Sequence, residues 1–216
     1  GAGGWRAGRR AASLVRAGEI VNGYETVRQR KDGSLVNVSL IYSPIHDTEG
    51  TLTGISAIVI DIFGRVKATQ RAEYASRALR TLSRANEALI RATSEQELFD
   101  QMCKVITEVG GYRLAWIGHP ENDAEKSVRV VAWAGLNNGY LEANGVCWSD
   151  TERGRGPTGA AIRTGRTQIN QNFTRNPTLA LWREAALERG FNSSIALPLK
   201  LTPDGVYGSL TIYAPE

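Results

Sequence analysis

Residues 64–93 contain no proline, and Gly64 is the only glycine among them. Because proline and glycine most often interrupt a helix, this stretch predicts one long, unbroken helix. On both sides of it the sequence changes to short apolar runs separated by turn residues, a pattern typical of strands. The chain is therefore predicted to belong to the α+β class, with a helical connector between two sheet-forming regions.

A heptad seam is predicted along this connector. Small, apolar or short polar residues recur there at alternating steps of four and three: Ala68, Ala72, Ala75, Leu79, Leu82, Asn86, Leu89 and Thr93. This spacing places them on one stripe of the helix and lets two helices pair as a coiled coil. We expect a homodimer through residues 64–93, in which Asn86 fixes the register. The alternative is an amphipathic helix that packs on its own domain.

The region before the connector contains three strand-like runs, Val21–Arg30, Leu35–Ile45 and Leu52–Ile62. Asp32 and Gly33 separate the first two runs. An Asp-Gly pair between strands is a strong hairpin signal, because it tolerates the positive φ of tight turns. The prediction is a three-stranded antiparallel meander with one face to bury.

The region after the connector is predicted to begin with a helix and to continue as a sheet. Ser94 and Glu97 have the spacing of a capping box, which predicts a helix over Glu95–Val109. The expected strands are Arg113–Gly118, Val128–Trp133, Val146–Trp148, Ser194–Leu201 and Val206–Tyr213, and the expected helices are Ala160–Thr164 and Thr178–Arg189. This order predicts a central antiparallel sheet flanked by helices.

The composition fits a globular protein, with 42% hydrophobic and 22% charged residues. The longest apolar run, Ile55–Ile62, is far shorter than the roughly 18 residues of a membrane span. The chain begins with glycine and shows no signal peptide, so we expect an internal piece of a longer, cytoplasmic protein whose membrane anchor could lie elsewhere. The net charge is +4, but the sequence contains no recognisable nucleic-acid-binding motif, so no nucleic acid partner is expected.

The residue types that carry catalysis are scarce. Cys103 and Cys147 have no paired spacing and no nearby histidine, which argues against a zinc site or a disulfide framework and suits a reducing compartment. No phosphate loop and no nucleophile–base pair is recognisable. The sequence therefore predicts no catalytic residue, no metal ligand and no enzyme activity.

Several features of the first region are shared with one class of sensory domain: Tyr24-Glu25, Arg30-Lys31-Asp32-Gly33, Ser43-Pro44-Ile45, Gly50, Gly54 and Asp61-Ile62. With them, residues 18–62 resemble the C-terminal three strands of PAS domains. The resemblance implies that residues 1–63 are a partial PAS domain. The half of that fold that closes over a ligand is absent, so no flavin or haem residue is carried over.

The region from residue 94 shares a larger set of spaced motifs with a second class: residues 111–118, Ala132-Trp133-Ala134-Gly135, Gly139-Tyr140-Leu141, Gly154 with Gly156-Pro157-Thr158-Gly159, Trp182-Arg183, Ser193-Ser194, residues 196–199 and Tyr207-Gly208. It resembles GAF domains of sensor histidine kinases and diguanylate cyclases. The resemblance implies that residues 94–216 form a GAF domain lacking its last helix, and residues 64–93 a signalling linker.

A small-molecule pocket in the GAF region would be lined by large aromatics and a few polar groups. The candidate ligand-binding residues are Trp116, Trp133, Trp148, Thr158, Trp182, Arg183 and Ser194. The alternative is that the aromatics fill the core while Arg183 pairs with a local carboxylate.

Known cofactors of the family are not expected here. Bilin-binding members attach the chromophore to a cysteine followed by histidine, whereas Lys104 follows Cys103 and Trp148 follows Cys147. Haem needs an axial histidine, and His119 precedes a proline at a strand end. Bilin, haem and flavin are therefore unsupported, and the ligand stays unknown.

The predicted function is sensory input and signal relay in a two-component or cyclic-dinucleotide signalling protein, with an output kinase or cyclase domain in the parent chain. The first alternative is a structural dimerisation or spacing module without a ligand. A redox enzyme on a GAF scaffold is a further alternative.

Overall fold

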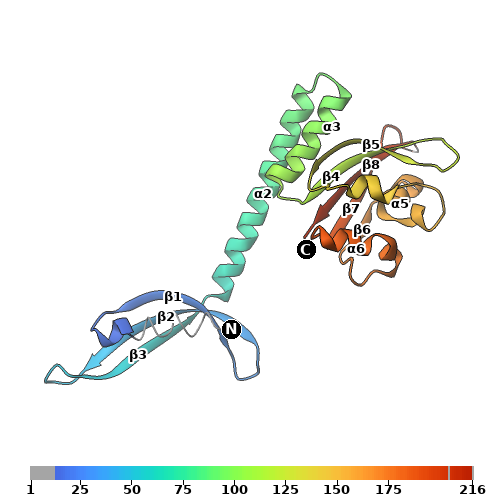
Figure 1. Ribbon diagram of the computed structural model, residues 1–216. Helices are drawn as coiled ribbons and strands as arrows, with labels where there is room; N and C mark the ends of the chain where they lie inside the picture. The colour runs from blue at the N-terminus through green and yellow to red at the C-terminus, as the bar shows by residue number, and fades with distance from the viewer. Residues whose placement is uncertain (1–12, 204, 216) are drawn as a thin grey trace. The chain divides into compact units, whose positions relative to one another are not determined.

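The computed structural model describes residues 13–203 and 205–215, so residues 1–12 of the predicted PAS region, Asp204 and Glu216 lie outside the described residues. The chain divides into two compact units, Gly1–Ala75 and Ser76–Glu216, and each is described by itself. The mixed α+β class is confirmed, with a three-stranded antiparallel sheet, a long helix and a five-stranded antiparallel sheet flanked by helices (Figure 1). The predicted boundaries at residues 63 and 93 stay predictions.

The first sheet is the predicted meander of strands β1 (Val21–Gln29), β2 (Leu35–His46) and β3 (Leu52–Asp61), in that spatial order. The first hairpin closes where the sequence predicted it. Gly33 has a φ of +86°, and the Arg30 amide donates to the Ser34 carbonyl at 2.7 Å. Both pairings are antiparallel.

Only part of this sheet is buried. Val36, Val38 and Leu40 on β2 form a small cluster, against which two tyrosines pack. On β3, by contrast, the neighbouring residues Ile58 and Val59 expose 55% and 59% of their surface. Successive side chains of a strand point to opposite faces, so these two residues report on both faces of β3. Strand β3 therefore lacks cover on both faces within the described part of the chain.

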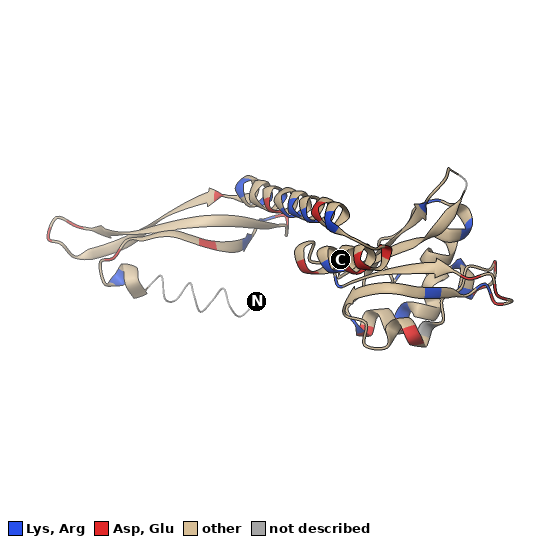
Figure 2. Ribbon diagram, turned by 90° about the horizontal axis from the view of Figure 1, so that it is seen from above, with Lys and Arg blue, Asp and Glu red and all other residues tan. Residues whose placement is uncertain are grey.

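Helix α2 (Phe63–Arg91) confirms the predicted long helix. The Asp61 carboxylate caps its start by accepting from the Phe63 amide at 2.9 Å. The structure describes every residue of α2, and none of them is buried. The seam residues Leu79, Leu82 and Leu89 are 68%, 61% and 58% exposed. Basic and acidic residues are interspersed along the helix (Figure 2), and Glu87 pairs with arginines on α2 itself.

Helix α3 (Glu95–Lys104) begins at the predicted cap, where the Ser94 hydroxyl accepts from the Glu97 amide at 3.2 Å. The prediction of one helix to Val109 was wrong in its last turn, because Val105–Val109 forms a π-helix. Thr107 supplies a physical reason. Its hydroxyl donates to the Cys103 and Lys104 carbonyls at 3.1 and 3.2 Å, which competes with the regular backbone ladder.

The second sheet has the order β5-β4-β8-β7-β6, with all neighbours antiparallel. Its strands are β4 (Leu114–Pro120), β5 (Val128–Gly135), β6 (Gln168–Asn170), β7 (Ser193–Lys200) and β8 (Val206–Ala214). Helix α3 covers one face. The other carries α4 (Tyr140–Asn144), α5 (Pro157–Thr164) and α6 (Ala180–Glu188), with short 3-10 turns at Arg153–Arg155 and Pro177–Leu179.

In this unit the sequence analysis missed two short elements and predicted one strand that does not form. Helix α4 and strand β6 are short and were not predicted. The expected strand Val146–Trp148 is absent from the described secondary structure and is replaced by a single bridge between Ser127 and Cys147. Two backbone hydrogen bonds flank this bridge, from the Val128 amide to the Val146 carbonyl at 2.9 Å and from the Trp148 amide to the Lys126 carbonyl at 2.8 Å. The pairing stops there, because the next carbonyls, of Trp148 and Ser149, accept from the Arg163 side chain.

Candidate functional site

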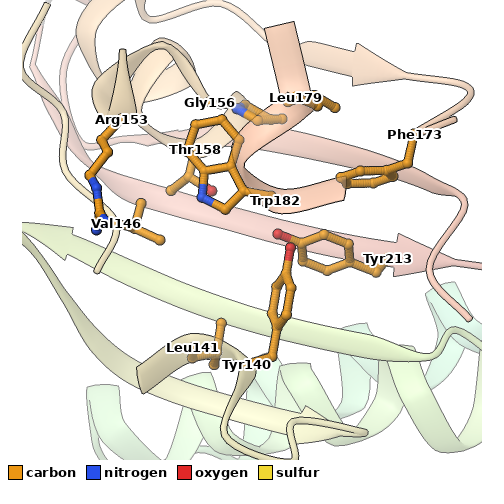
Figure 3. A pocket seen from close by; sticks show the side chains of 11 residues that line it. Tyr140, Leu141, Val146, Arg153, Gly156, Thr158, Phe173, Leu179, Trp182 and Tyr213 are labelled. Atoms are coloured by element: carbon orange, nitrogen blue, oxygen red, sulfur yellow. The ribbon is translucent and has the colours of Figure 1, made fainter. Parts of the chain in front are cut away.

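An aromatic cavity lies between the second sheet and the layer formed by α4, α5 and α6 (Figure 3). Its walls come from three stretches of chain, residues 140–158, residues 173–182 and Tyr213 on β8. The lining residues are Tyr140, Leu141, Val146, Arg153, Gly156, Pro157, Thr158, Phe173, Leu179, Trp182 and Tyr213. Pockets of this kind, mostly apolar with a few convergent polar groups, are the usual small-molecule sites of proteins.

The start of α5 is shaped to admit the Trp182 ring. Pro157 is the first residue of α5, where its fixed φ suits a helix start and its missing N–H costs nothing. Gly156 precedes it, and a Cβ there would lie 2.9 Å from the Trp182 Cη2 atom. Glycine at position 156 therefore lets the indole of α6 pack directly against the backbone.

Two tyrosine hydroxyls meet at the floor of the cavity. The Tyr140 and Tyr213 hydroxyls share a hydrogen bond, and the two rings lie edge-on with centroids 5.5 Å apart. Burial raises the pKa of both phenols, because the charged phenolate is poorly solvated in this site. Both groups therefore stay neutral and serve as hydrogen-bonding groups at physiological pH.

The sheet beneath the cavity carries further buried polar groups. Thr158 on α5 and Thr211 on β8 share a hydrogen bond of 2.8 Å between their hydroxyls. Ser194 and Asn170 lie in register with Tyr213 across β8, β7 and β6, hence on the same face. Neither the Ser194 hydroxyl nor the Asn170 Nδ2 finds a hydrogen-bond partner among the described residues. A buried polar group without a partner costs stability unless water or a ligand satisfies it.

The cavity is nearly filled by its own side chains. The room for the centre of a water molecule is about 20 Å³, which is enough for one or two waters. A ligand larger than a few atoms would therefore need an outward movement of the covering layer.

The structure brings two of the seven candidate ligand residues into the cavity wall, Thr158 and Trp182. Trp116 and Ser194 are buried in the same half of the domain but do not line it. Trp133 lies on the edge strand β5 and is 46% exposed. The ligand-binding role of all seven stays a prediction.

The side chains of the remaining two candidates, Trp148 and Arg183, donate hydrogen bonds to backbone carbonyls. The Trp148 ring packs against the core, and its Nε1 donates to the Glu121 carbonyl at 2.9 Å. Arg183 donates to the Phe173 and Asn176 carbonyls at 3.0 and 2.9 Å. It thus fastens the loop before α6 through carbonyl groups, whereas the alternative reading expected a carboxylate.

The sequence analysis did not identify several residues of the cavity wall. Tyr213 and Thr211 are two residues apart on β8, and side chains two apart on a strand point to the same face. The strand pattern could therefore have placed Tyr213 beside Thr211. Tyr140 stands in a motif shared with the GAF family, but α4 was not foreseen. Phe173 and Leu179 come from the irregular segment between β6 and α6, for which periodicity gives no signal.

No group of three or more histidine, cysteine or acidic residues is placed to hold a metal ion within the described ranges. Across those same residues, no helix is both long and apolar enough to cross a membrane. Cys103 is on α3 and is buried in the apolar cluster between α3 and the sheet. The Cys147 sulfur lies 3.4 and 3.8 Å from the Ser149 and Thr151 hydroxyl oxygens.

The sequence profile of the GAF domain family matches residues 92–216 of this chain. No curated protein matches the chain.

Several solved structures resemble about two thirds of this chain. The free methionine-R-sulfoxide reductase from Neisseria meningitidis, solved with its substrate, is 15% identical with a TM-score of 0.50, covering 67% of this chain and 76% of that one. The GAF domain of the Acinetobacter phosphoenolpyruvate-protein phosphotransferase is 15% identical with a TM-score of 0.48, covering 64% and 77%. The A. aeolicus nlh2 GAF domain in an inactive state is 22% identical with a TM-score of 0.48, covering 63% and 80%. At 15% identity, the likeness to the Neisseria reductase shows the fold alone.

Proposed function

This chain belongs to the GAF domain family through residues 92–216, a family of sensory and regulatory domains in signalling proteins, and we propose that it senses a small molecule in the cavity beneath α5 and α6. The observation that carries the proposal is the aromatic and apolar wall around the paired Tyr140 and Tyr213 hydroxyls. Apolar walls supply affinity and the few polar groups select the ligand.

The size of the cavity defines how sensing would work. Because the closed cavity has room for only one or two waters, the ligand must bind a state in which α5 or α6 has moved outward. A ligand shifts an equilibrium between two states only through its different affinity for them. Sensing here is therefore a shift from the closed state toward a ligand-filled one.

The signal would be relayed through α2. Its leucine seam is exposed on one stripe, and we propose that two copies of the chain pair along residues 64–93. The exposed β3 surface and the PAS-like motifs favour a partial PAS domain before it. The parent protein would be a sensor histidine kinase or a diguanylate cyclase in the cytoplasm, with its output domain outside this sequence.

The second candidate is a structural spacing module without a ligand. It is supported by the small volume of the cavity, because a nearly filled cavity is also what a well-packed core would show. The redox alternative has less support. The Cys103 thiol is buried and burial raises its pKa to about 12, so it would be a poor nucleophile.

Thermal unfolding against a panel of amino acids, short carboxylates and polyols separates the first two candidates. A bound ligand at 100 times its dissociation constant stabilises by about 2.7 kcal/mol, which raises the midpoint by several degrees. We expect one member of the panel to do so for the 216-residue chain and for Trp133→Phe, but not for Trp182→Phe. If no member raises the midpoint, the spacing module is favoured.

A further inference from the structure

Arg189, at the end of α6, joins this helix to the turn before α4. Its Nη2 donates to the Asn138 carbonyl at 2.8 Å, and its Nε donates to the Asn137 carbonyl at 3.3 Å. Its Nη1 donates to the Ala185 carbonyl of α6 itself at 2.9 Å and lies 3.7 Å from the Glu188 carboxylate. The Arg189 side chain is only 19% exposed, so these contacts are shielded from most of the solvent.

The turn that receives Arg189 leads directly into the aromatic cavity. Asn138 has a φ of +42°, in the left-handed region that few residues other than glycine adopt, and Gly139 follows with a φ of +74°. The guanidinium carbon of Arg189 also lies 5.6 Å from the centroid of the Tyr140 ring, within the range of a cation–π contact. Arg189 therefore holds the chain where it enters α4 and contacts one of the two paired tyrosines.

One side of the cavity belongs to a single segment, residues 173–192, called here the α6 segment. It contributes three residues of the wall: Phe173, Leu179 and Trp182. The ends of the segment meet, because the Phe173 amide donates to the Asn192 carbonyl at 2.8 Å. Within it, Arg183 donates to the carbonyls of Phe173 and Asn176. The α6 segment is thus bonded to itself and can move as a unit.

Helix α5, by contrast, is fastened to the sheet. It packs against β6, β7 and β8, whereas α6 lies mainly against α4 and the 3-10 turn Pro177–Leu179. Thr158 on α5 also shares a hydrogen bond of 2.8 Å with Thr211 on β8. Of the two helices, α6 is therefore the one that can move outward while α5 and the sheet stay in place.

We propose that the aromatic cavity opens by separation of α6 from α4, and that Arg189 is the latch that holds it closed. Breaking the bonds to Asn137 and Asn138 releases the α6 segment from the α4 turn, and Trp182 moves with it. Local openings of this kind occur without unfolding of the whole chain. The inference rests on the proposed sensory function for its purpose, but the opening is a property of the chain alone and is measured without a ligand.

The rate at which a thiol reagent modifies a cysteine on the α6 segment measures this opening. In the 216-residue chain carrying Cys147→Ser, Leu179→Cys places a thiol on the cavity wall at a position that is 2% exposed. Cys103 is fully buried on α3, at the opposite face of the sheet, and is the internal control. Mass spectrometry of peptides reads both sites. We expect position 179 to react faster than Cys103, because opening of α6 needs less free energy than unfolding of the whole chain.

The latch is tested by Arg189→Gln in the same chain. It should raise the modification rate at position 179 about tenfold, the usual effect of losing charged hydrogen bonds, and leave the rate at Cys103 unchanged. Arg175→Gln is the matched control, because Arg175 is an exposed arginine of the same segment, and it should change neither rate.

The opening is overturned if position 179 reacts no faster than Cys103 in the chain that retains Arg189. This first comparison needs no change at Arg189, so it decides the matter when Arg189→Gln does not fold. The latch is overturned if Arg189→Gln leaves position 179 unchanged, accelerates both thiols equally, or does no more than Arg175→Gln. Opening at position 179 together with a thermal panel that finds no ligand would reject the sensory site and retain the moving α6 segment.

Discussion

The hydroxyl of Tyr140 on α4 shares a hydrogen bond with the hydroxyl of Tyr213 on β8, beneath the Trp182 indole (Figure 3). This bond joins the covering layer of helices to the sheet at the floor of the aromatic cavity. The two residues are separated by most of the domain in sequence, so their contact exists only in the folded state. It is therefore a direct probe of whether the cavity is closed.

Tyr213→Phe removes one of the two hydroxyls and leaves the Tyr140 hydroxyl buried without this partner. Loss of one buried hydrogen bond should lower the free energy of unfolding by about 1 kcal/mol. Urea denaturation followed by tryptophan fluorescence measures the change. Tyr74→Phe on α2, where the side chain is 69% exposed, is the control and should change nothing. An equal effect of both substitutions would show that the bond in the cavity contributes no stability.

Gly156→Ala should displace the Trp182 ring, because the added methyl would lie 2.9 Å from the indole in the present structure. Overpacking of this kind costs about 1–3 kcal/mol. We expect a lower free energy of unfolding and a shifted emission maximum of Trp182. The control is Gly64→Ala near the start of α2, where nothing lies within 4 Å of the added Cβ. Unchanged stability and emission for Gly156→Ala would contradict the described packing.

The Cys103 thiol gives stability a pH dependence of known sign. Burial raises its pKa from 9.0 to about 12, so the folded chain holds this proton more tightly than the unfolded chain. Its contribution is fully present below about pH 9 and is lost as the pH rises from 9 toward 12. The slope is at most about 1.4 kcal/mol per pH unit.

Urea denaturation between pH 8 and pH 11 measures this effect as the difference between the native chain and Cys103→Ala, since other groups titrate in the same range. The difference in unfolding free energy should shrink as the pH rises. A thiol reagent at pH 8 should modify Cys147, which is partly exposed, before Cys103. Equal modification rates, or a difference independent of pH, would show that Cys103 is not shielded as described.

Much of the framework could be predicted from the sequence, because it depends on local rules. Asp32 and Gly33 predict the first hairpin through the positive φ of Gly33, and Ser94 predicts the start of α3 through its cap. The absence of proline predicts α2. Each of these signals acts over a few residues of chain.

The walls of the cavity could be predicted only in part, because they depend on contacts between distant segments. Phe173 and Leu179 belong to an irregular segment whose course is set by what it packs against. Sequence alone does not distinguish the environments of Trp133 and Trp182. Trp133 lies on the edge strand β5, whereas Trp182 lies on α6 and lines the cavity. Composition identifies aromatic residues, whereas strand order decides which of them meet.

The exposed seam of α2 predicts a concentration-dependent dimer. Sedimentation velocity on the native chain and on the Leu79→Glu, Leu82→Glu double variant measures it. Two charges at the paired positions of a seam should abolish association, because they would be buried against apolar partners. Ser83→Glu, an exposed residue on α2 outside the seam, is the control and should still dimerise. A native chain that stays monomeric at high concentration would refute pairing through residues 64–93.

The proposal that the aromatic cavity is a sensory site is tested most directly by the indole N–H signals of Trp182 and Trp133 in a ¹⁵N-labelled chain. Trp182 lines the cavity and is 7% exposed, whereas Trp133 lies on the edge strand and is 46% exposed. Titration with the same amino acids, carboxylates and polyols should move the Trp182 signal to a plateau for one ligand while the Trp133 signal stays in place. A Trp182 signal that no member of the panel moves, or one that moves only together with Trp133, would contradict the account.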